Sequence, residues 1–172
     1  MDARPIVLAQ FQMSHRFLGQ VMDDCAPDFL TRPMPGNLAS IGVIFAHTAI
    51  AEDYLVNVAG LERPMLYTSE GWQEKTRGPK VDRPEQNAAF TAAIAESDMA
   101  AFREYAQAVF AATERIIETE PDSVLDREAE RPIFGKSSVL GFIGGIGLYH
   151  VTEHSGEIAA LKGVHGLKGL PF

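Results

Sequence analysis

The side chains best suited to chemistry are two histidines four residues apart, His150 and His154. On a helix, positions i and i+4 lie on one face with Cβ atoms about 5–6 Å apart. Both rings can therefore reach one metal ion about 2.0–2.1 Å from each nitrogen. Two protein ligands seldom suffice to hold a metal. Since the chain has five histidines, the third ligand is sought among His15, His47 and His165.

His47 is the preferred third ligand, because the spacing of Ile44, Ala51, Tyr54 and Val58 predicts a helix with His47 on or beside its inward stripe. In an antiparallel bundle the second and fourth helices can face each other across the core, as metal sites on facing helices require. Three imidazoles and a water give the open coordination used for metal chemistry. Ordinary core or surface histidines are the alternative interpretation.

The residues next to the histidine pair allow other interpretations. His150 to His154 also matches the HxxEH pattern of inverted zinc proteases, with Glu153 as the base. Those enzymes draw an acidic ligand from far downstream, and this sequence ends soon after His154. Glu157, one turn further, is better placed to accept the second N–H of a ligand histidine. His15 is a fourth ligand only if its stripe faces the site, and His165 is expected in solvent.

Three further motifs do not support a site. Gly135-Lys136-Ser137 is not a phosphate loop, because Glu130 stands where the first glycine is needed. The glycine-rich run 141–147 does not match the dinucleotide-binding pattern. The single cysteine, Cys25, is expected to be a small packed side chain, and it excludes an intramolecular disulfide and a CxxC motif.

Length and composition describe an ordinary globular protein. The chain has 172 residues, of which 46% are hydrophobic and 22% charged, and we expect a single domain over 1–172. The net charge of −8 and the lack of a basic cluster argue against nucleic-acid binding. No apolar run reaches the roughly 18 residues of a membrane span. With no signal-peptide pattern visible, a cytoplasmic location is expected.

The apolar periodicity predicts an all-α protein, a four-helix bundle with a long loop between helices two and three. The loop, residues 61–85, is a candidate lid or binding loop. Residues 122–135 form a second connection with room for short extended pieces. The four expected helices run from Pro5 to Asp24, from an Asn37 N-cap to Gly60, from Gln86 to Thr119 with a bend at Ser97-Asp98, and from a Ser137 or Ser138 N-cap to Lys162.

The fourth helix has an unusual number of glycines in its first half: Gly141, Gly144, Gly145 and Gly147. Each costs roughly 0.5–1 kcal/mol of helix stability relative to alanine. A helix face without side chains therefore indicates that another helix packs closely against it. The approaching helix belongs either to the same chain or to a second copy, and we expect a homodimer.

With His47 on helix two and His150-x3-His154 on helix four, the chain resembles the DinB/YfiT-like family of metalloenzymes. The resemblance covers nearly the whole chain. It rests on Asn37-Leu38 before the helix of His47 and Ala51-Glu52, on His154-Ser155-Gly156-Glu157-Ile158, and on the tail from Gly166 to Phe172. It implies a four-helix bundle, commonly dimeric, in which the three histidines hold a divalent metal, often zinc or nickel.

The resemblance also implies a function. Relatives include thiol-dependent S-transferases and isomerases that use mycothiol, bacillithiol or glutathione. We therefore expect a divalent-metal-dependent enzyme that joins a low-molecular-weight thiol to a small electrophilic substrate, with Tyr54, Tyr67 or Trp72 as pocket walls. The alternative is a non-catalytic metal-binding dimer, a sensor or scaffold. The glycine-rich start of helix four departs from the family pattern and leaves the shape of the pocket open.

Overall fold

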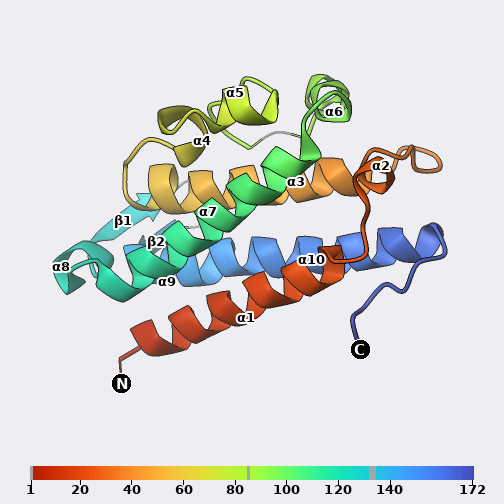
Figure 1. The fold of residues 1–172 in the computed structure, drawn as a ribbon. Coiled ribbons are helices and arrows are strands. Elements are labelled where there is room, and N and C mark those ends of the chain that lie inside the picture. Colours follow the sequence, from red (N-terminus) through yellow and green to blue (C-terminus); the bar gives the residue numbers. More distant parts are fainter. Residues whose placement is uncertain (1, 85, 132–134) are drawn as a thin grey trace.

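A computed structural model describes residues 2–84, 86–131 and 135–172. Four long helical rods form a bundle in which α1 and α3 each contact α7 and α10. The first and last rods run in one direction and the middle two in the other (Figure 1). The rods are α1 (Arg4–Met22), α3 (Ile41–Asp53) with its π-helical continuation η1 (Tyr54–Gly60), α7 (Met99–Thr119), and α9 (Val139–Phe142) with η2 (Ile143–Gly147) and α10 (Leu148–Val164). This confirms the all-α four-helix bundle.

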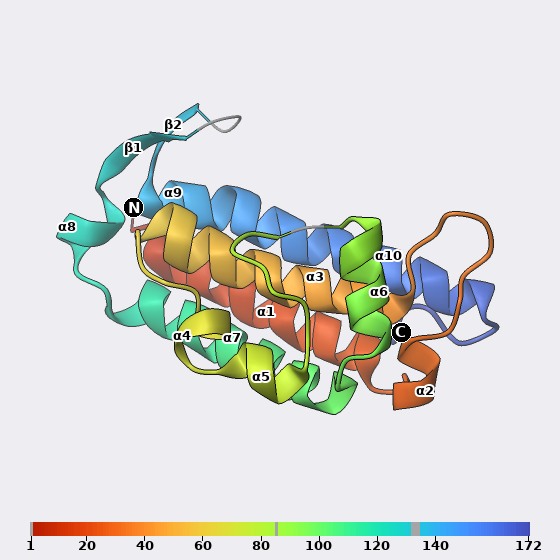
Figure 2. The ribbon, with the colours of Figure 1, turned by 90° about the horizontal axis from the view of Figure 1, so that it is seen from above.

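Because α3 and α7 are parallel neighbours, the chain must return along the bundle between them. This return confirms the long connection, but it is not the irregular loop we expected. It contains α4 (Leu66–Ser69) and α5 (Trp72–Thr76), and α6 (Ala88–Ala95) crosses α3 further along (Figure 2).

The buried carboxylate of Asp53 fixes the start of this connection. It accepts hydrogen bonds from the backbone N–H of Leu66 and Tyr67, the Asn57 amide and the Tyr105 hydroxyl, at 2.7–3.0 Å. Four donors compensate for the burial of the carboxylate. The segment is thus tied to both α3 and α7 at its origin, which argues against a loose lid there.

Two expected helix boundaries are wrong, and local capping explains both. The second long helix begins at Ile41 rather than after Asn37, because the Ser40 side chain accepts from the Val43 N–H at 3.3 Å. The single helix expected over residues 86–119 is two helices, α6 and α7. The two helices are separated at Ser97-Asp98, where the sequence suggested a bend. The Asp98 carboxylate caps α7 by accepting from the Ala100 and Ala101 N–H groups. Ser138 caps the fourth rod, as expected.

The remaining elements are short. They are α2 (Pro27–Leu30), α8 (Asp122–Leu125) and an antiparallel hairpin of β1 (Glu128–Arg131) and β2 (Gly135–Ser138), which pairs Glu128 with Ser138 and Arg131 with Gly135. Strand β1 is one of the short extended pieces expected in the 122–135 connection, whereas β2 begins at its last residue and runs on to Ser138. Arg131 ties it to the bundle by donating to the Ala59 carbonyl at 3.0 Å and by covering the Phe142 ring.

Part of the glycine-rich stretch is explained within the chain. A Cβ on Gly144 would lie 3.0 Å from the Val7 side chain, and one on Gly147 would lie 3.4 Å from Phe11. Helix α1 therefore packs closely against two of the four glycines. For these two, the approaching helix belongs to the same chain rather than to a second copy. Gly145 faces open space.

Among the described residues, one continuous helix, Ile41–Gly60, has the length and hydropathy of a membrane span. Of its most apolar window, 89% is buried inside the bundle. Two buried acidic residues, Glu52 and Asp53, lie within it. This is the pattern of a core helix.

Candidate metal centre

The three histidines singled out by the sequence lie together between two adjacent rods. His47 comes from α3, and His150 and His154 come from successive turns of α10. The Nε2 atom of His150 lies 3.1 Å from Nε2 of His47 and 3.2 Å from Nε2 of His154. One nitrogen from each ring falls within 4.8 Å of the other two. The structure therefore brings together the three histidines that the sequence predicted as ligands, and their binding of a metal stays a prediction.

The centre keeps its middle imidazole neutral. Burial, together with the nearby His154 and His47 rings, lowers the pKa of His150 to about 3. At neutral pH this ring therefore retains a lone pair for coordination. The His154 ring is oriented by Glu157, whose carboxylate accepts from Nδ1 at 2.7 Å, so that Nε2 points to the other two rings. Glu157 thus occupies the orienting position expected from the sequence.

The donor set fits a divalent cation. Two nitrogens bound tetrahedrally about 2.0–2.1 Å from one ion are about 3.3–3.4 Å apart, close to the observed 3.1 and 3.2 Å. Without a cation, the single ring nitrogen Nε2 of His150 can donate at most one proton, yet it faces two other nitrogens. A cation accepts a lone pair from each ring and removes this conflict. Three protein nitrogens also leave a position open for water or substrate.

A cavity of about 420 Å³ lies about one helical turn from the histidine centre, and none of the three histidines is among its described lining residues. The cavity is linked to the centre by Glu157, which lines it and accepts a hydrogen bond from His154. Its wall also includes the turn of α3 before His47 and the start of α6, whose Phe90 ring meets the His47 ring edge-on at 6.4 Å. The lining residues are Asn37, Leu38, Ala39, Val43, Ile44, Gln86, Asn87, Ala88, Thr91 and Glu157.

The aromatic residues suggested as pocket walls do not line this cavity. Tyr67 is fully buried in the core, where its hydroxyl donates to the Pro79 carbonyl at 3.2 Å. Trp72 packs against Tyr105 on the same side of the bundle, and Tyr54 packs against the core. These three assignments were wrong. Tyr67 and Trp72 lie in a connection without periodicity, which gives no facing direction from the sequence alone, whereas Tyr54 lies on the second rod but packs against the core.

His15 and His165 stay outside the centre. His165 is partly buried rather than in solvent, with its ring edge-on to Phe29 at 5.0 Å. His15 is buried, and carboxylates occupy both of its ring nitrogens. Nε2 lies 3.1 Å from the Glu52 carboxylate and Nδ1 lies 2.7 Å from Glu114. This arrangement, here called the His15 clamp, leaves no lone pair for a metal.

The His15 clamp joins three rods and was not anticipated. Thr113 donates to Glu52 at 2.6 Å, and Phe110 stacks on the His15 ring at 4.2 Å. Burial lowers the pKa of His15, but the two carboxylates outweigh this and raise it above its ordinary value. The sequence offered one signal, the acidic pair Glu52-Asp53 within a largely apolar helix.

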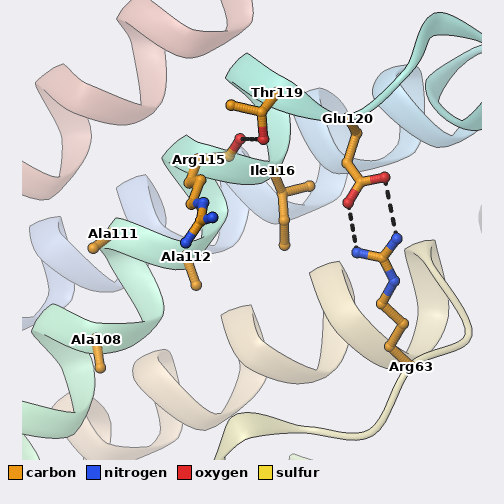
Figure 3. A pocket seen from close by; sticks show the side chains of 8 residues that line it. All are labelled: Arg63, Ala108, Ala111, Ala112, Arg115, Ile116, Thr119 and Glu120. Atoms are coloured by element: carbon orange, nitrogen blue, oxygen red, sulfur yellow. Dashed lines mark hydrogen bonds and ion pairs between the residues drawn. The ribbon is translucent and has the colours of Figure 1, made fainter.

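A second large cavity, of about 470 Å³, lies along α7, which carries none of the three histidines (Figure 3). Alanines 108, 111 and 112 line it, and Arg63 forms a two-pronged ion pair with Glu120 at 2.6 and 3.1 Å at one end. Exposed ion pairs of this kind contribute little energy. Because the described residues form no cluster of metal ligands beside this cavity, the histidine centre is the stronger candidate for function.

The fold and the site define a helical bundle with a three-histidine centre between its second and fourth rods. The model of the DinB superfamily matches residues 5–158, and the chain belongs to this superfamily. Among solved structures, a conserved protein from Enterococcus faecalis is similar, with a TM-score of 0.76 and 16% identity over 95% of this chain and 97% of the other. At that identity the likeness concerns the fold alone. No curated protein matches the chain.

Proposed function

We propose that His47, His150 and His154 bind one divalent metal ion, zinc or nickel, and that the protein is a thiol-dependent S-transferase or isomerase acting on a small electrophile. The observation that supports this most directly is the convergence of three Nε2 atoms beside an accessible cavity. Nitrogen-only ligation suits both metals. When bound, such an ion would hold a thiol sulfur and lower its pKa, so that thiolate persists at neutral pH.

The residues of the chain have separate tasks in this proposal. His150 remains neutral and contributes a lone pair, while Glu157 holds His154 by its other nitrogen. In this proposal the cavity of about 420 Å³ receives the thiol tail and the electrophile. In transfer, sulfur forms a bond to the electrophilic carbon, the leaving group departs with the electron pair, and the thiol proton passes to solvent.

The test is a thiol-transfer assay on metal-loaded protein. Low-molecular-weight thiols are combined with an electrophile such as monochlorobimane, and fluorescence reports the thioether. We expect a rate that depends on added zinc or nickel and is lost in His150→Ala. If no thiol gives a metal-dependent rate, the enzyme proposal fails, and the non-catalytic metal-binding bundle becomes the better account.

We also propose that the protein is a homodimer and that the outer face of α1 and α10 forms the interface. Two large apolar side chains, Met13 and Tyr149, are 60% and 62% exposed there. Gly145 faces open space at the start of the same rod. A second backbone can approach where no side chain intervenes. This face buries apolar groups that the single chain leaves in water.

A further inference from the structure

We propose that the cavity beside the three histidines, here called the tail cavity, selects thiols with neutral or positively charged tails and disfavours tails that carry a carboxylate. This inference rests on the proposed function, because the tail of a thiol held at the histidines must lie in the space next to them. The inference concerns the substrate class, which the family does not fix for this chain.

The tail cavity is continuous with the metal-binding elements. Ile44 and Val43 occupy the turn of α3 that precedes His47. On α10, Glu157 lies one turn beyond its hydrogen-bond partner His154. In the proposal, a thiol whose sulfur is held at the three Nε2 atoms extends its tail by about one helical turn to reach these walls.

The charge of the wall is the observation that carries the inference. Of the ten described residues that line the tail cavity, the only charged one is Glu157. The other polar residues among them are neutral: three amides, Asn37, Gln86 and Asn87, and the Thr91 hydroxyl. Within the described part of the chain, no lysine or arginine lines the cavity.

The energetic consequence differs with the charge of the tail. A carboxylate entering the cavity gives up water and meets the Glu157 carboxylate without a compensating cation. An ammonium group gains the attraction of Glu157, which is 42% exposed and has acceptor capacity beyond its bond to His154. Hydroxyl and amide groups find neutral donors and acceptors in the side-chain amides. Apolar contacts with Val43 and Ile44 are available to all three classes.

The cavity on α7 provides a contrast within the same molecule. Its lining includes Arg115, and Arg63, which is paired with the Glu120 carboxylate of the same lining. An anionic tail finds the Arg115 cation there, but the described residues place no cluster of metal ligands beside it. The two requirements of a carboxylate-bearing thiol, a sulfur position and a cation for its tail, are thus in different places on this chain.

The experiment measures thiol binding to the cobalt-loaded protein by its sulfur-to-cobalt charge-transfer absorption. The probes are cysteamine, 2-mercaptoethanol and 3-mercaptopropionate, which are similar in size and have tails that are positive, neutral and negative. The quantity compared is the ratio of the Kd of 3-mercaptopropionate to that of cysteamine. Intrinsic differences between the two thiols cancel when this ratio is compared between protein variants.

The informative variant is Thr91→Lys, which adds a cation to the wall on the exposed side of α6. The matched control is Ala92→Lys, which adds the same charge to the next residue of α6, also exposed but outside the lining. We expect Thr91→Lys to lower the ratio about tenfold, the order expected for unit charges several ångströms apart near a surface. Ala92→Lys should change it by less than about twofold. Added salt should reduce the difference.

The outcomes separate the two proposals. If charge-transfer bands appear but the ratio is the same in wild type and Thr91→Lys, or changes equally in Ala92→Lys, the selectivity is refuted while the thiol chemistry stands. If none of the three thiols gives a band, the proposed function fails and the selectivity with it. Ala88→Lys changes another residue of the same wall and replaces Thr91→Lys if circular dichroism shows that the latter does not fold.

Discussion

Replacing His15 by leucine should destabilise the protein and remove a specific pH dependence. In the His15 clamp, the fully buried Glu52 has two partners, the His15 ring and the Thr113 hydroxyl. His15→Leu leaves the Glu52 carboxylate in the core with one donor. Removing one member of a buried ion pair lowers the free energy of unfolding by about 3–5 kcal/mol. We expect His15→Leu to lower it by an amount in that range.

The sign of the pH effect follows from the raised pKa of His15. A group whose pKa is higher in the folded state stabilises the fold fully below its unfolded value, about 6.5. This contribution is lost as the pH rises through the folded value. The neutral ring can donate to only one carboxylate, so the other contact becomes repulsive. The wild type should therefore lose stability above about pH 6.5, and His15→Leu should lack that part of the slope.

Urea denaturation followed by circular dichroism, at several pH values between 6 and 9, measures both effects. Glu114→Gln is the matched control, because it removes the outer carboxylate, whose side chain is 29% exposed, and keeps the inner pair. Glu114→Gln should lower the free energy of unfolding by less than His15→Leu does, by about 1 kcal/mol. Equal stability of wild type and His15→Leu at pH 6, or parallel slopes from pH 6.5 to 9, would refute the reasoning.

Three further predictions follow from other parts of the structure. Glu157→Gln, which weakens the acceptor for His154, should lower zinc affinity about tenfold in a chelator competition, and an unchanged affinity would contradict its orienting role. Tyr105→Phe removes one of four donors to the buried Asp53 and should cost about 1–3 kcal/mol in thermal or urea unfolding; a neutral effect would mean that the other donors suffice. In light scattering the wild type should have about twice the mass of the 18.8 kDa chain and Gly145→Leu a lower mass, whereas a monomeric wild type would exclude the dimer.

The bundle and the histidine cluster follow from sequence periodicity, because both depend on which residues share a helix face. The spacing of His150 and His154 fixed their common direction, and the stripe through His47 placed that ring toward the same interior. Apolar spacing likewise located all four rods. Their ends were less certain, since Ser40 and Asn37 are both good caps and only packing selects between them.

The features that sequence reasoning missed are those set by contacts between distant segments. Tyr67 and Trp72 lie in the long connection, where no period indicates a facing direction. The His15 clamp depends on three rods that bring their side chains to the same height in the bundle. Periodicity predicts on which face of its helix a residue lies, but not which residue of another helix it contacts. The same limit applied to the glycines, since their spacing predicted close approach without saying that α1 is what approaches Gly144.

The central claim is that three histidines form one metal site, and zinc titration of metal-free protein by calorimetry tests it most directly. We predict one zinc ion per chain in the wild type, and affinity reduced at least a hundredfold in His47→Ala, His150→Ala and His154→Ala. His165→Ala, a histidine at the end of the same rod but outside the cluster, should bind like the wild type. A wild type that does not bind zinc or nickel, or a His150→Ala variant that binds both as tightly as the wild type, would contradict the account.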